Sequence, residues 1–161
     1  MFYLDLFSAL ERHNVDYLLI GGLAVSLYGI ERATMDVDIT IAMNPENRAA
    51  LIRAARELKL TPVLPVSLES LEDLELLRMW HTERNLEAFA MRTSELTSVT
   101  LDILLFPPVE FIGMLQRAVT FNAGTTPIRT ACIDDLIALK QAVGRPIDIA
   151  DIEHLNRVRQ L

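Results

Sequence analysis

The stretch that indicates the fold most directly is Arg32-Ala33-Thr34-Met35-Asp36-Val37-Asp38, which lies behind the glycine pair Gly21-Gly22. Between residues 32 and 42, the even positions up to Thr40 are polar and the odd positions are apolar. A β-strand sends alternate side chains to opposite faces of a sheet. The stretch therefore predicts a strand with one polar face, on which Arg32, Thr34, Asp36 and Asp38 lie together.

The segments on either side alternate between strand and helix patterns. Residues 15–20 form an apolar run typical of a buried strand, and the glycine pair separates it from a short helix. Asn44-Pro45 is typical of a helix start, because asparagine caps helices and proline suits their first position. We expect helices over 2–12, 23–28, 45–58, 69–83, 110–117, 134–143 and 146–159, and extended segments over 15–20, 32–42, 61–66, 87–92, 99–105, 119–121 and 127–130.

This order of elements predicts an α+β (mixed α/β) fold, with a small mixed sheet flanked by helices and a C-terminal helical segment. The length of 161 residues and the apolar content of 51% suit a single compact domain. We expect a core over residues 1–106, on which the strands and helices of residues 107–161 pack.

Composition narrows the classes of function. A single cysteine, Cys132, excludes a disulfide within the chain, and the three histidines lie far apart in the sequence. The net charge of −7 argues against sequence-independent coating of nucleic acid, but it leaves a small substrate, a tRNA end or a protein open. The most apolar window, residues 17–30, is too short to span a bilayer, and no leader pattern is visible. We therefore expect a soluble, cytoplasmic protein without a membrane partner.

A third carboxylate, Asp102, stands alone in the apolar run of residues 99–105. An unpaired buried charge is costly, so an aspartate there needs a reason. If this run pairs with the strand over 32–42, Asp36, Asp38 and Asp102 converge. Carboxylates that close repel one another unless a cation lies between them, and magnesium prefers such oxygen ligands. The pattern predicts two Mg²⁺ ions, with Mn²⁺ as an acceptable substitute, arranged for phosphoryl transfer.

The glycine pair and Arg32 are both suited to binding phosphate groups. Glycines let the backbone approach a triphosphate, and the following helix presents free N–H groups to it. Arg32 can pair either a phosphate or a carboxylate with two hydrogen bonds. Two simpler alternatives stay open at this point. The glycine pair can be a tight turn only, and Asp36 and Asp38 can belong to a solvated sheet edge.

These residues together resemble a known superfamily. Gly21-Gly22, Asp36-Val37-Asp38 and Leu101-Asp102-Ile103 look like the pattern of polymerase-beta-type nucleotidyltransferases. The fuller runs of residues 19–24 and 32–38 are similar to the AbiEii-type branch of bacterial nucleotidyltransferase-fold proteins, many of which are toxins of toxin–antitoxin pairs or uncharacterised relatives.

The resemblance implies magnesium-dependent transfer of a nucleoside monophosphate from a nucleoside triphosphate to a hydroxyl of RNA (a tRNA end), protein or a small molecule. It implies that Asp36 and Asp38 bind both metal ions and that Asp102 binds the catalytic one. Gly21, Gly22, Arg32, Thr34 and Lys140 would hold the triphosphate. A toxin–antitoxin role would add a cognate antitoxin or toxin as a protein partner.

The C-terminal region agrees with this resemblance. The runs of residues 135–140 and 144–152 are similar to the ending of that branch, in which a lysine and an aspartate face the active site. By resemblance Lys140 contacts phosphate and Asp148 supports the site or the acceptor. Ile147 stands where a lysine is common, which lowers the local positive charge. The alternative is that Lys140 is a helix-surface lysine and that Asp148 and Asp151 are acids favoured at a helix start.

A competing hypothesis belongs to another class of function. The chain could keep the fold as a catalytically weak or inactive partner-binding module, similar to an antitoxin. The presence of all three carboxylates favours the enzyme.

Overall fold

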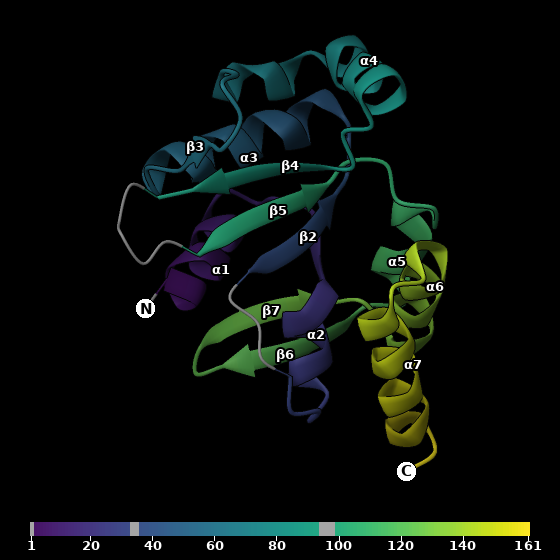
Figure 1. The fold of residues 1–161 in the computed structure, drawn as a ribbon. Coiled ribbons are helices and arrows are strands. Elements are labelled where there is room, and N and C mark those ends of the chain that lie inside the picture. Colours follow the sequence, from purple (N-terminus) through teal and green to yellow (C-terminus); the bar gives the residue numbers. More distant parts are fainter. Residues whose placement is uncertain (1, 33–35, 94–98) are drawn as a thin grey trace.

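The structure is a computed structural model that describes residues 2–32, 36–93 and 99–161. It contains a seven-stranded mixed sheet in the order β3-β4-β5-β2-β1-β7-β6 (Figure 1). The strands are β1 (Tyr17–Ile20), β2 (Val37–Ile41), β3 (Thr61–Pro62), β4 (Ala88–Arg92), β5 (Thr100–Leu104), β6 (Val119–Ala123) and β7 (Thr126–Thr130). The helices are α1 (Phe2–Arg12), α2 (Gly21–Leu27), α3 (Pro45–Glu57), the 3-10 helix η1 (Leu68–Glu72), α4 (Leu74–Arg84), α5 (Phe111–Gln116), α6 (Ile133–Val143) and α7 (Pro146–Arg159).

β2 pairs with β5 in the structure, which confirms the strand pairing that the predicted convergence of the carboxylates required. β2 runs antiparallel to β1, with Ile20 opposite Asp38, and parallel to β5, with Asp38 opposite Asp102. β4 continues the sheet beyond β5 in antiparallel register, and β7 pairs with β1 in parallel. The sheet therefore joins strands from the N-terminal and the C-terminal regions of the chain.

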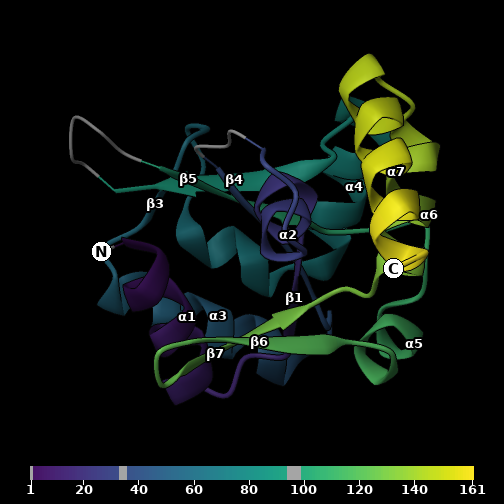
Figure 2. The same ribbon diagram turned by 90° about the horizontal axis from the view of Figure 1, so that it is seen from below.

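The apolar face of the central strands forms the core. Val37 and Ile39 of β2 and Leu101 and Ile103 of β5 are fully buried, whereas the aspartates between them lie on the opposite face and are half-buried. α1 and α3 pack against each other in this core, as Figures 1 and 2 show. Burial of alternate residues thus turns the polar face away from these helices.

The C-terminal region ends in a helical pair. α6 stops at Gly144, whose φ of +71° is a left-handed conformation that favours glycine at a helix end. Pro146 then opens α7, and both views place α7 beside α6 (Figures 1 and 2). The pair lies where its side chains can meet the polar face of β2 and β5.

Most expected elements are present, with differences that have local causes. α2 begins at Gly21, two residues earlier than predicted, because the φ of +74° at Gly21 turns the chain directly from β1 into the helix. The helix predicted over 69–83 is divided into η1 and α4, since the Asp73 carboxylate accepts a hydrogen bond from Leu76 N and caps a new helix. The cap that Asn44 provides for α3 is confirmed.

Several predicted segments have other bounds in the structure, and three of them are extended segments near the site or at an edge of the sheet. The strand predicted over 32–42 is paired only from Val37 to Ile41, and residues 33–35 lie outside the described residues. Of the extended segment over 61–66, only Thr61–Pro62 pairs with β4. β6 reaches Ala123, because its hairpin with β7 is closed by Gly124 at a φ of +64°. Within the described part of the chain, no helix is both long enough and apolar enough to cross a membrane.

Candidate active site

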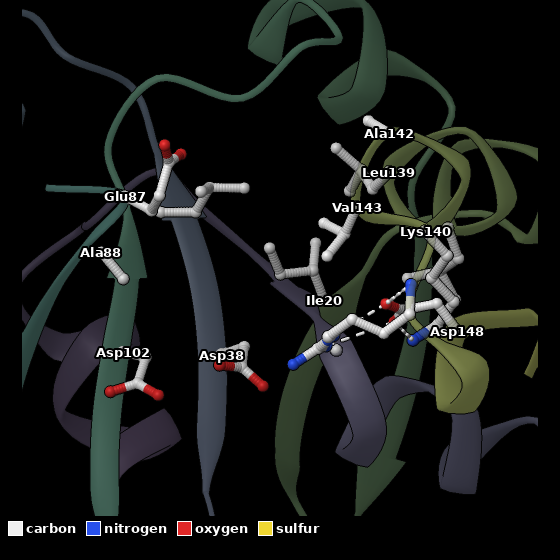
Figure 3. Close-up of a pocket in the computed structure, with 14 residues that line it drawn as sticks. Ile20, Asp38, Glu87, Ala88, Asp102, Leu139, Lys140, Ala142, Val143 and Asp148 are labelled. Carbon is white, nitrogen blue, oxygen red and sulfur yellow. Dashed lines mark hydrogen bonds and ion pairs between the residues drawn. The ribbon is translucent and has the colours of Figure 1, made fainter. Parts of the chain in front are cut away.

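The centre of the site is the pair Asp38 and Asp102. They occupy matching positions on the parallel strands β2 and β5, so both side chains leave the same face of the sheet. Both line a pocket of about 540 Å³ that lies between these strands and the helical pair. Figure 3 shows the two carboxylates on neighbouring strands at one side, and Lys140 and Asp148 on the other.

The pKa values of both aspartates are raised. Burial raises the pKa of Asp38 to about 7, and the negative charges of Asp102 and Asp36 add to the effect, against a smaller opposing effect of Lys140. Burial also raises the pKa of Asp102, again with a contribution from Asp36. Near neutral pH the protein therefore has a site that favours either a proton or a metal cation between these residues.

Asp36 lies close to the pair but is engaged elsewhere. It is exposed, and its Oδ1 accepts a hydrogen bond of 2.7 Å from Thr100 Oγ1 on β5. Among the residues that the structure describes, no three His, Cys, Asp or Glu side chains are grouped as a ready-made metal site. The donors are hard carboxylate oxygens that suit magnesium. Asp38 and Asp102 are positioned together, and the Asp36 carboxylate next to them is held on β5 by Thr100.

Gly21 fits tightly beneath Asp38. Its φ is +74°, and a Cβ atom built on it would overlap the Asp38 carboxylate. Gly22 is buried within α2, and its carbonyl accepts a hydrogen bond from Ser26 Oγ. The glycine pair thus makes a tight turn and, at Gly21, also allows the backbone to pass close to a predicted metal ligand.

Lys140 is buried, so the alternative of a helix-surface lysine is wrong. Its side chain is 7% exposed, and Nζ lies 2.9 Å from Asp151 Oδ2 and 3.8 Å from Asp148 Oδ1. Arg32 Nε donates to the other oxygen of Asp151 at 3.1 Å. Of the two partners proposed for Arg32, the structure shows the carboxylate. Asp151 therefore joins α6, α7 and the segment before β2 through two ion pairs.

Asp148 holds an arginine that the sequence analysis did not single out. Arg145 donates to Asp148 from Nε at 2.8 Å and from Nη2 at 3.2 Å, and its backbone N–H bonds the same carboxylate at 3.1 Å. Burial alone would raise the pKa of Asp148, but the hydrogen bonds and charge of Arg145 outweigh it and lower that pKa. The helix-start alternative for Asp148 is correct in part, since it caps α7, but it also positions a side chain that lines the pocket.

The structure brings together some of the predicted residues and separates others. Gly21, Asp38, Asp102, Lys140 and Asp148 line the pocket, whereas Gly22, Arg32 and Asp36 do not, and Thr34 lies outside the described residues. The sequence analysis missed Arg145 and Glu87, which also line it. Arg145 stood within the C-terminal run used for the resemblance, so its place before Pro146 was a usable signal. Glu87 is in no motif, and only the fold identifies it.

The remaining wall of the pocket is apolar. Ile20, Ala88 and Leu104 lie on the strand side, and α6 contributes Leu136, Leu139, Ala142 and Val143. An apolar wall with a few charged groups at fixed places is typical of small-molecule sites.

No protein-family model matches the sequence, and no curated protein matches it. Solved structures do. The lincomycin-bound lincosamide antibiotic adenylyltransferase LnuA matches with a TM-score of 0.60 and 16% identity, over 94% of this chain and 92% of that one. ANT(2")-Ia in complex with adenylyl-2"-tobramycin matches with a TM-score of 0.57 and 15% identity, over 96% and 89%. A nucleotidyltransferase-like protein from Paracoccidioides brasiliensis matches with a TM-score of 0.53 and 18% identity, over 93% and 71%.

These similarities show that the chain has a nucleotidyltransferase-like fold, as predicted. The AbiEii-type branch and the toxin–antitoxin role are finer statements that remain predictions.

Proposed function

We propose that the protein is a magnesium-dependent nucleotidyltransferase that moves a nucleoside monophosphate from a nucleoside triphosphate to a hydroxyl of a small molecule. The observation that carries this proposal is the in-register pair of Asp38 and Asp102 on the floor of a pocket, in a nucleotidyltransferase-like fold. Phosphoryl transfer of this kind needs positioning and charge neutralisation more than covalent help from the protein.

The proposed step balances without a further reactant. The acceptor oxygen forms a bond to the α-phosphorus, and the bond from that phosphorus to the bridging oxygen of the β-phosphate breaks. Pyrophosphate leaves with the electron pair, and the proton of the acceptor hydroxyl passes to the Asp102 carboxylate. The Asp102 carboxylate lines the pocket beside Asp38, where it would meet the acceptor hydroxyl.

Asp36, Asp38 and Asp102 are the residues that would hold magnesium, or manganese in its place. When bound, the ion would neutralise the negative charge of the phosphates and of the carboxylates. The raised pKa of Asp38 supports this role, because it reflects burial and like charges that a cation would offset. Gly21 and Gly22 would let the nucleotide approach the turn, and Thr34 would help to hold the triphosphate, as the resemblance implies. Arg32 and Lys140 both pair with Asp151, so phosphate binding by either would have to coexist with that carboxylate or replace it.

The pocket favours a small acceptor with positive charge. Its volume of about 540 Å³ lies within the range of drug-sized sites. Glu87 is the third carboxylate on the strand side of the pocket, after Asp38 and Asp102, and an amine on the acceptor would pair with it. The net charge of −7 disfavours long nucleic acid. Among the similar structures, one holds adenylyl-2"-tobramycin and another holds lincomycin, which supports a small hydroxylated acceptor.

A screen of labelled ATP, CTP, GTP and UTP with Mg²⁺ tests this proposal. The acceptors are tobramycin and lincomycin as small hydroxylated probes, total tRNA, and the protein itself. We expect label to pass to a small acceptor, with one pyrophosphate released for each acceptor modified. Transfer only to tRNA or protein would overturn the choice of acceptor. If no nucleotide is transferred to any acceptor or bound with Mg²⁺, the hypothesis of an inactive partner-binding module replaces the enzyme.

A further inference from the structure

The pocket has an uneven distribution of charge. Asp38, Asp102 and Glu87 make its strand side negative. A nucleoside triphosphate brings several more negative charges, so it needs a cationic group of the protein beyond any metal ion. Among the pocket-lining residues that the structure describes, Lys140 and Arg145 are the basic ones.

Lys140 is poorly placed to meet a ligand. Its side chain is 7% exposed, and its ammonium group lies between Asp151 and Asp148, whose side chains are each 2% exposed. If Lys140 turned to a ligand, the buried carboxylates of Asp151 and Asp148 would lose its positive charge, and the loss of a partner is costly for a buried ion.

Arg145 has the opposite character. Its side chain is 65% exposed, yet Asp148 fixes its guanidinium through Nε and Nη2. A guanidinium has five N–H donors, so this pairing leaves donors for a ligand in the pocket. Arg145 and Asp38 line the same pocket, so the guanidinium faces the space that a nucleotide bound at Asp38 would enter.

We propose that Arg145 is a substrate-binding residue that holds the β- and γ-phosphates of the nucleotide and receives the leaving pyrophosphate, and that Asp148 is its positioning residue. This inference rests on the proposed function and assigns one part of the same site. A planar guanidinium that is held in place binds two phosphate oxygens at once, and less side-chain entropy is lost on binding. Arg145 also supplies positive charge beside Ile147, where the resemblance led us to expect a lysine.

Direct binding to the full-length chain tests this inference without turnover. The probes are the four α,β-methylene nucleoside triphosphates and the four monophosphates, each with Mg²⁺ in a calorimeter. The variants are Arg145→Gln, Arg145→Lys and Asp148→Asn. The matched control is Arg117→Gln, because Arg117 also pairs with an aspartate, Asp135, through Nε and Nη2 but does not line the pocket.

We expect Arg145→Gln to raise the Kd of the triphosphate that binds best by about 10- to 100-fold, the effect of losing hydrogen bonds between charged groups. The Kd of the matching monophosphate should change less than about twofold, and Arg117→Gln should leave both constants unchanged. Arg145→Lys keeps the charge but not the fork, so its Kd should lie between those of the wild type and Arg145→Gln. Asp148→Asn should weaken triphosphate binding several-fold by releasing the guanidinium.

Other binding results would overturn this inference alone or the proposed function as well. If the wild type binds the triphosphate more tightly than the monophosphate and Arg145→Gln retains that preference, the inference is overturned and the proposed function is not. If the wild type binds no nucleotide, both are overturned. Since Arg145 is the N-cap residue of α7, circular dichroism and thermal melting check each variant. Should Arg145→Gln fail to fold, unchanged triphosphate binding by Arg145→Lys and Asp148→Asn would overturn the inference.

Discussion

Gly21 and Asp38 are so close that a side chain at Gly21 would occupy the space of the Asp38 carboxylate. Gly21 follows β1 and begins α2 at a φ of +74°, and its neighbour Ile20 lies opposite Asp38 in the sheet. The Asp38 carboxylate therefore occupies the space that a side chain at the turn would need, and the geometry of the turn and of the carboxylate depend on each other.

Gly21→Ala is expected to destabilise the protein by about 1–3 kcal/mol more than a comparable glycine substitution, because it adds overlap to the backbone strain of a positive φ. The matched control is Gly124→Ala, since Gly124 has a φ of +64° but open space where a Cβ atom would lie. Urea unfolding of both variants gives the two changes in free energy. Equal losses in the two variants would show that Asp38 does not constrain Gly21.

Asp38→Asn is expected to stabilise the metal-free protein at neutral and higher pH. The pKa of Asp38 is raised to about 7, mainly by burial and by the charge of Asp102, so its contribution to stability is present below pH 4 and is lost as the pH rises through 7. Asparagine has no charge to bury. At pH 8 the variant should melt a few degrees above the wild type, an effect of order 1 kcal/mol.

The pH series supplies the control for this comparison. The advantage of the variant should shrink toward pH 4, where the wild-type carboxyl is protonated in the folded state. Mg²⁺ with nucleotide should raise the melting temperature of the wild type more than that of Asp38→Asn. An advantage that is independent of pH would mean that the charge of Asp38 is not its cause.

Asp151→Asn is expected to cost about 3–5 kcal/mol, because the substitution removes the charge that Lys140 and Arg32 share within the protein. The matched control is Asp134→Asn, whose ion pair with Arg159 is exposed and should contribute less than about 1 kcal/mol. Chemical denaturation measures both. Similar small losses would show that the helical pair does not depend on Asp151.

Glu87→Gln tests the charge of the acceptor. If the acceptor carries an amine that pairs with Glu87, the variant should raise its KM by about 3- to 10-fold, with kcat and the KM of the nucleotide nearly unchanged. Glu83→Gln is the control, because Glu83 is exposed on α4 and does not line the pocket. An unchanged KM for an amine-bearing acceptor would remove Glu87 from its binding site.

The central strands and their carboxylates were predictable from the sequence for a simple reason. Alternation of polar and apolar residues fixes which face of a strand is buried, and a lone aspartate in the apolar run of β5 indicated a matching strand. Because both apolar faces enter one core, Asp38 and Asp102 lie on the same face of the sheet, and the structure adds that they are direct partners.

The helical side of the site was harder to predict. Lys140 sits near the end of an amphipathic helix, where surface lysines are common, and only the packing of α7 on α6 buries it. Arg145 and Glu87 reach the pocket from segments far apart in the sequence, and local patterns carry no information about which of them face each other. The division between η1 and α4 was more accessible, since aspartate is a common helix cap.

The most direct test of the account is the transfer of labelled nucleoside monophosphate to the best acceptor, measured with and without Mg²⁺ for the wild type, Asp38→Asn and Asp102→Asn. The account predicts transfer by the wild type only with the metal ion, and a loss of about 1,000-fold or more in each variant that still folds, since each removes a group that acts on the transition state. Transfer that persists in either variant, or in the wild type after complete removal of divalent metal, would contradict it.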